Sequence, residues 1–140
     1  MSAPTLSSLT VGDLVAEQEF AVSRDSLVRY AGASGDFNPI HYRDDVAASV
    51  GLPGVLAHGM LTMGLAAQPV VDWAGGPGAV VDYEVRFTRP VVVDPEDGAA
   101  VTVVAKVGRI DEAAARIDLT VTFNGETVLG KAQVVVRLEA

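Results

Sequence analysis

The chain has 140 residues, of which 49% are hydrophobic and 20% charged, and it contains no cysteine. This length suits one domain with its own core, so we expect residues 1–140 to form a single domain. The lack of cysteine excludes disulfide bonds, thiolate nucleophiles and cysteine-ligated metal sites. The formal net charge of −8 argues against binding to nucleic acid or to an anionic membrane surface.

The first ten residues and the low-charge middle of the chain show no pattern of a signal peptide or of a membrane span. Residues 1–10 lack a basic segment followed by an apolar run, and the long low-charge stretch 46–81 is interrupted by Asp72 and by Gly and Pro residues. We therefore expect a cytoplasmic protein.

A short strand over 17–22 is expected first, followed by two short helices. Ser23 is the candidate N-cap of the first helix, with Val22 and Leu27 as a hydrophobic staple, and the glycines within 32–35 are expected to end that helix. A second helix is expected over 44–50, with Asp44 as its cap and Gly51 as its stop.

The segment from Met60 to Trp73 is apolar on nearly every side, which predicts a long buried helix. Pro69 lies inside it and is expected to kink or interrupt it. Four later segments alternate apolar and polar residues with period two, and Asn124-Gly125 between the third and fourth is typical of a tight hairpin. The expected strands span residues 81–87 (with Val81 and Phe87 facing inward), 101–107, 117–123 and 128–138. The pattern predicts an α+β fold in which an antiparallel sheet wraps around the buried helix.

The only two histidines, His41 and His58, lie in the glycine-rich middle of the chain. Asp36 precedes His41 by five residues on a loop that Pro39 stiffens. An Asp and a His held on one rigid loop can converge on one water molecule or substrate proton, and imidazole exchanges protons near neutral pH. The alternative interpretation is structural, with Asp36 capping a turn and His41 making a local hydrogen bond, and ordinary turn chemistry favours it when the spacing is taken alone. Spacing leaves both interpretations open.

The segment Ala57-His58-Gly59-Met60 leads into the apolar helix. The first N–H groups of a helix have no partner inside it, and Gly59 lets a ligand carbonyl approach closely, so a thioester oxygen bound here would be stabilised as it gains negative charge. The alternative is a tight turn that needs Gly59 for its backbone freedom, with His58 holding the turn. The spacing of the two histidines matches no recognised metal-ligand pattern.

The uninterrupted segment Ser34-Gly35-Asp36-Phe37-Asn38-Pro39-Ile40-His41 resembles the hydratase-2 motif of the MaoC-like (R)-specific enoyl hydratases and dehydratases. The segment from Ala57 to Met60 resembles the second motif of that family, and with the strand pattern the resemblance covers nearly the whole chain. Within the family, the chain is most similar to the HadB-type catalytic subunits of (3R)-hydroxyacyl-ACP dehydratases.

The resemblance implies a hot-dog fold and a hydro-lyase that adds water reversibly to trans-2-enoyl thioesters of CoA or acyl carrier protein in fatty-acid metabolism, including that of mycolic acids. It implies that Asp36 and His41 are catalytic and that the Gly59 N–H binds the thioester carbonyl. It also assigns supporting roles to Asn38 and His58. No metal or redox cofactor is expected.

The same resemblance implies a dimer, formed with a second copy or with a related subunit. Some relatives carry a Ser on the central helix where this chain has Ala67. An acidic carrier protein would need a locally basic entrance, for which Arg43, Arg86 and Arg89 are candidates. Two alternatives stay open: a non-catalytic acyl-binding or partner subunit, and a hot-dog thioesterase, which the absence of Asp and Glu from residues 60–71 disfavours.

Overall fold

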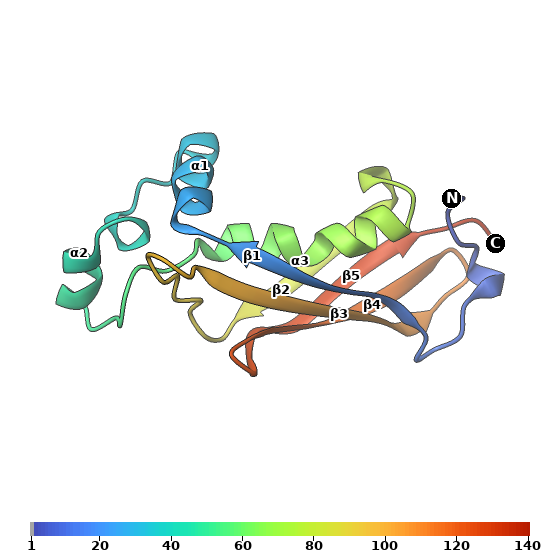
Figure 1. The fold of residues 1–140 in the computed structure, drawn as a ribbon. Helices are drawn as coiled ribbons and strands as arrows, with labels where there is room; N and C mark the ends of the chain where they lie inside the picture. The colour runs from blue at the N-terminus through green and yellow to red at the C-terminus, as the bar shows by residue number, and fades with distance from the viewer. Residues whose placement is uncertain (1) are drawn as a thin grey trace.

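The fold is an antiparallel sheet with one long helix lying along one of its faces (Figure 1), in a computed structural model that describes residues 2–140. Five strands pair in the order β1-β3-β4-β5-β2. They span Leu14–Val22 (β1), Val80–Phe87 (β2), Ala99–Ile110 (β3), Ala114–Phe123 (β4) and Glu126–Arg137 (β5). The helices are Arg24–Ser34 (α1), Asp44–Ser49 (α2) and Gly59–Trp73 (α3), with short 3-10 turns at Leu6–Ser8 (η1), Pro39–His41 (η2) and Pro77–Ala79 (η3). This arrangement confirms the predicted α+β architecture.

The predicted alternation is confirmed in β3 and β4, which form the centre of the sheet. The inward-facing positions of both strands are buried: Val101, Val103, Ala105, Val107, Ile117, Leu119 and Val121. Phe123 pairs with Glu126 across a two-residue loop. The loop residues Asn124 and Gly125 have φ values of 50° and 75°, the backbone conformation that such a tight hairpin needs.

Strand β2 departs from the predicted pattern. Val81 and Phe87 are 48% and 57% exposed, so the prediction that they point inward is wrong. The register with β5 shifts at positions 80–82 and again at 84–86. Such bulges change which side chains face the core, and Val80 packs against the core in place of Val81. Because β2 is an edge strand that pairs only with β5, no second strand of the described residues constrains its register.

Helix α3 buries one stripe rather than its whole circumference. Thr62, Ala66, Pro69 and Val70 are buried, and their spacing places them on one side of the helix. Met60 is 60% exposed, so the prediction of a helix buried on most sides is wrong for this chain, in which the sheet covers one side only. The helix continues through Pro69, so the proline does not interrupt it. Among residues 2–140, no helix is long and apolar enough to cross a membrane.

Helix α1 begins as the sequence predicts. The Ser23 Oγ accepts a hydrogen bond from the Ser26 N–H at 3.2 Å, and Val22 and Leu27 are both buried. The helix ends at Ser34, within the glycine-containing segment expected to stop it, and its C-cap Gly35 has the left-handed φ of 76° that is typical of a helix stop. The chain therefore leaves α1 immediately before Asp36.

Helix α2 differs in its cap and in its end. Arg43, not Asp44, is the N-cap residue, and the helix ends at Ser49 rather than at Val50. The Asp44 carboxylate instead pairs with Arg24, the first residue of α1, at 3.0 Å. This ion pair links the two short helices, which lie at one end of the sheet (Figure 1).

Candidate active site

The imidazole of His41 is positioned by the 3-10 turn η2 between α1 and α2. The Asn38 side chain begins this turn, because its Oδ1 accepts the Ile40 N–H at 3.2 Å. The His41 Nδ1 lies 2.7 Å from the backbone oxygen of Leu56. A carbonyl can only accept, so Nδ1 carries a proton and donates it to Leu56. His41 is therefore a buried imidazole whose Nε2 is the nitrogen left free of this bond.

The Asp36 carboxylate divides its two oxygens between a turn and the site. Its Oδ1 accepts the Asn38 N–H at 3.2 Å, and its own N–H donates to the Ser34 Oγ at 3.1 Å. Its Oδ2 lies 4.0 Å from the His41 Nε2. The Asp36 side chain is half exposed, so the carboxylate keeps contact with solvent. Structural hydrogen bonds thus occupy the Asp36 Oδ1 and the His41 Nδ1. The Asp36 Oδ2 and the His41 Nε2 take no part in them and face each other.

His58 is completely enclosed behind the pair. Its ring stacks on His41, with centroids 3.8 Å apart and planes 21° from parallel, and Tyr30 contacts it edge-on at 4.7 Å. Its Nε2 lies 3.2 Å from the backbone oxygen of Asp36. Burial is the main cause that lowers the pKa of His58 below its ordinary value of 6.5; proximity to His41 adds to this, and the Asp36 carbonyl opposes it.

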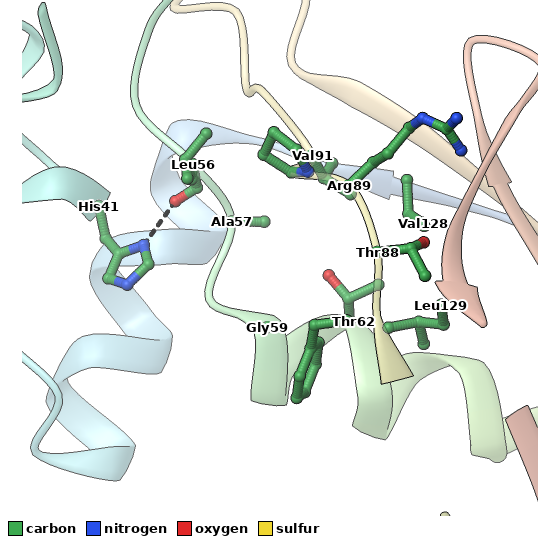
Figure 2. Close-up of a pocket in the computed structure, with 12 residues that line it drawn as sticks. His41, Leu56, Ala57, Gly59, Thr62, Thr88, Arg89, Val91, Val128 and Leu129 are labelled. Carbon is green, nitrogen blue, oxygen red and sulfur yellow. Dashed lines mark hydrogen bonds between the residues drawn. The ribbon is translucent and has the colours of Figure 1, made fainter. Parts of the chain in front are cut away.

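A cavity of about 340 Å³ opens beside His41 (Figure 2). Gly59, the first residue of α3, forms part of its wall, and its N–H has no partner within the helix. A Cβ atom at Gly59 would lie 2.9 Å from the ring of Phe87, so only glycine leaves this wall unchanged. The lining residues are His41, Leu56, Ala57, Gly59, Thr62, Phe87, Thr88, Arg89, Pro90, Val91, Val128 and Leu129. Asp36 does not line the cavity itself, but it lies beside His41, which does.

Some lining residues were not singled out in the sequence, and some predicted candidates lie elsewhere. Thr62 is a buried polar residue on the first turn of α3 that faces the cavity, whereas Ala67 does not line it. Arg89 lines the cavity on the side opposite His41 (Figure 2). Arg43 is paired with Asp45 on the surface and does not reach the cavity. The signal that the sequence offered for Thr62 is a lone Thr three residues after Gly59, at the start of a largely apolar helix.

The same cluster contains three potential metal ligands. One ligand atom from each of Asp36, His41 and His58 lies within 4.8 Å of the others. However, the stacked imidazoles hold their in-plane lone pairs in two nearly parallel planes, which do not converge on one ion. One nitrogen of each ring is also engaged by a backbone carbonyl. The arrangement suits proton transfer better than tetrahedral metal binding.

Comparison with known proteins shows which family the chain resembles in sequence and in fold. A model of the MaoC-like domain matches residues 8–126. The (R)-specific enoyl-CoA hydratase of Rhodospirillum rubrum is 32% identical over 117 residues, covering 82% of this chain and 80% of that protein. The 3-hydroxyacyl-thioester dehydratase X of Mycobacterium tuberculosis is 41% identical over 70 residues, half of this chain and 24% of that protein.

A solved MaoC-like dehydratase superposes with a TM-score of 0.94 at 38% identity. The match covers 98% of this chain and 43% of that structure. The shared architecture confirms the hot-dog fold. The chain spans most of the Rhodospirillum hydratase but less than half of the other two proteins. Since the family model covers most of the sequence, this chain belongs to the MaoC-like dehydratase family.

Proposed function

We propose that the chain is a hydro-lyase that interconverts a trans-2-enoyl thioester and water with a (3R)-3-hydroxyacyl thioester, carried by CoA or by acyl carrier protein. The observation that carries this proposal is the placement of the His41 Nε2 4.0 Å from the Asp36 Oδ2, beside the N-terminus of α3. Family membership supports the same reaction, because the Rhodospirillum relative is named an (R)-specific enoyl-CoA hydratase.

In the hydration direction, His41 acts as the base. Its Nε2 takes a proton from a water molecule, and the water oxygen forms a bond to C3 of the enoyl group. The electron pair of the double bond moves to C2, which receives a proton from Asp36, so hydration starts from the form of the pair in which the Asp36 Oδ2 carries a proton. The proton on His41 then returns to Asp36, which restores both groups. Dehydration follows the same steps in reverse.

Gly59 supplies the stabilising donor for this reaction. As C3 is attacked, negative charge develops on the thioester oxygen, and the Gly59 N–H at the positive end of α3 binds it. The acyl group occupies the cavity of about 340 Å³, whose walls include Leu56, Val91 and Leu129. Asn38 supports the site indirectly by fixing the turn that carries His41.

We further propose that the exposed side of α3 and the edge strand β2 bind a second hot-dog subunit, either another copy of this chain or a related one. Met60, Val81 and Phe87 are large apolar side chains at least 48% exposed on these two elements. Sedimentation or light scattering of the purified chain tests this proposal. A monomer at micromolar concentration, with no partner required for activity, would contradict it.

The test of the reaction is the loss of enoyl absorbance when the purified chain is mixed with trans-2-enoyl-CoA substrates. We expect a 3-hydroxyacyl product of the R configuration and no release of free thiol. Formation of the S product would contradict the assigned geometry. Free thiol without hydration would indicate a thioesterase, although the only carboxylate on α3, Asp72, lies 13 residues and about 20 Å along the helix from Gly59. Tight acyl-CoA binding without turnover, alone and with a partner, would indicate a non-catalytic subunit.

A further inference from the structure

His58 contacts all three groups of the proposed site through different atoms. Its ring stacks on His41 at 3.8 Å, and its Nε2 lies 3.2 Å from the Asp36 backbone oxygen. Its own backbone oxygen accepts the N–H groups of Leu61 and Thr62, which begins α3 and orients Gly59. With 1% of its surface exposed, His58 is also more buried than either Asp36 or His41.

The hydrogen bonds determine which proton His58 carries. The Asp36 carbonyl can only accept, so the His58 Nε2 is the protonated nitrogen. Its Nδ1 is buried and has no hydrogen-bond partner among residues 2–140. A second proton on Nδ1 would place a charged N–H group in the interior without an acceptor, which is strongly unfavourable. His58 therefore remains a neutral imidazole.

The two stacked rings consequently donate through different nitrogens. His41 carries its proton on Nδ1 toward Leu56, and His58 carries its proton on Nε2 toward Asp36. The titratable groups that face His58 are His41 from η2, Asp36 from the loop after α1, and Tyr30 from α1. When His41 gains a proton during turnover, a neutral neighbour adds no like charge at close range, whereas a charged imidazole in the same place would oppose that proton.

We propose that His58 is a positioning residue, a neutral imidazole that fixes the His41 ring and the Asp36 backbone relative to each other and exchanges no proton with substrate. The effect of His58 on turnover rests on the proposed hydratase function. The stack constrains the plane of the His41 ring, and the Nε2–H bond constrains the loop that carries the Asp36 carboxylate. Misplacing either reacting group by about 1 Å is enough to lower turnover by about 100-fold.

Two variants separate these contacts. His58→Phe keeps an aromatic ring for the stack but removes the donor to Asp36, and His58→Gln keeps an N–H donor but removes the ring. We expect each to lower kcat by about 10- to 100-fold with little change in KM, because the acyl cavity is not altered. Tyr42→Phe, which changes an exposed aromatic residue, is the matched control and should retain full activity. Wild-type kcat in both folded His58 variants would overturn the proposal.

Imidazole ¹⁵N NMR tests the proposal without relying on activity. The chain has only two histidines, so the spectrum of His58→Phe assigns both. We expect His58 to be neutral with its proton on Nε2 at pH 6.5, and His41 to carry a proton on Nδ1 that exchanges slowly with water. In His58→Gln, the His41 Nδ1 proton should exchange faster. A charged His58 at pH 6.5, a proton on its Nδ1, or unchanged His41 exchange in this variant would overturn the proposal. If the wild type has no hydratase activity, the proposed function fails, and these spectra still decide the role of His58 in holding His41.

Discussion

The His41 Nε2 and the Asp36 Oδ2 lie 4.0 Å apart, too far for a direct hydrogen bond but close enough for one water molecule to contact both. Each side chain uses its other polar atom for structure: the His41 Nδ1 donates to Leu56, and the Asp36 Oδ1 accepts from Asn38. These structural bonds fix the direction of the two reacting atoms. The same two side chains therefore stabilise the turn with one polar atom and form the candidate site with the other.

Replacement of His41 should distinguish its two nitrogens. In His41→Asn, the side-chain amide can still donate to the Leu56 oxygen but nothing replaces Nε2, so we expect normal folding and a loss of turnover of about 100-fold or more. Thermal melting and enoyl-CoA hydration by the same preparation provide the measurement. Asp45→Asn, an exposed carboxylate on α2, is the control for general effects of surface substitution. An active His41→Asn enzyme would exclude Nε2 as the base.

Activity should be sensitive to a single methyl group added where Gly59 and Phe87 meet in the cavity wall. Gly59→Ala places a Cβ atom 2.9 Å from the Phe87 ring, and because Phe87 is 57% exposed, we expect its ring to move rather than the helix to unfold. The displaced ring would disturb the cavity, so kcat/KM should fall while the melting temperature changes little. The control is Phe87→Ala, which removes the clashing ring: in this background, adding Gly59→Ala should cost little further activity. An equal further loss in both backgrounds would show that the methyl group acts on the N–H donor instead.

The lowered pKa of His58 predicts a dependence of stability on pH. Because the folded state binds this proton less readily than the unfolded state, His58 lowers the free energy of unfolding as pH falls below about 6.5, and it has no such effect above that value. The slope contributed by one such group is at most about 1.4 kcal/mol per pH unit. Urea denaturation between pH 7.5 and 5.5 should therefore show a smaller acid destabilisation in His58→Phe than in the wild type. Equal losses would show that other groups cause the effect.

The hydroxyl of the partly buried Tyr83 joins β2 to α3. Tyr83 donates to the Met63 backbone oxygen at 2.6 Å, and burial raises the pKa of Tyr83 to about 12. We expect Tyr83→Phe to lower the free energy of unfolding by about 1 kcal/mol and to leave hydration unaffected, since Tyr83 does not line the cavity. Chemical denaturation measures this change. Tyr42→Phe, at an exposed position, should cost less, and equal costs would argue against the hydrogen bond.

The sequence contained enough local information to predict several parts of this molecule. The Ser23 cap, the Asn124-Gly125 hairpin and the alternation of β3 depend on neighbours along the chain, and all three are confirmed. The closeness of Asp36 and His41 is also local, because Asn38 and Pro39 shape the short loop between them.

Other features depend on contacts between distant segments. Leu56 holds His41 through its backbone oxygen, a group that every residue carries, so the sequence gave no signal for this contact. The contact of Phe87 with Gly59 depends on where β2 ends relative to α3, and the bulges in β2 arise only through pairing with β5. The exposure of Met60 depends on how much of α3 the sheet covers. None of these can be obtained from periodicity, because periodicity describes one element at a time.

The most direct test of the account is kcat/KM for trans-2-enoyl-CoA hydration by Asp36→Asn compared with the wild type. Asparagine keeps the Oδ1 that accepts the Asn38 N–H and replaces only the oxygen that faces His41, so the loop should be preserved. The account predicts an unchanged melting temperature and a loss of kcat/KM of about 100-fold or more. A folded Asp36→Asn protein that hydrates the substrate as fast as the wild type would contradict the proposed pairing of Asp36 with His41.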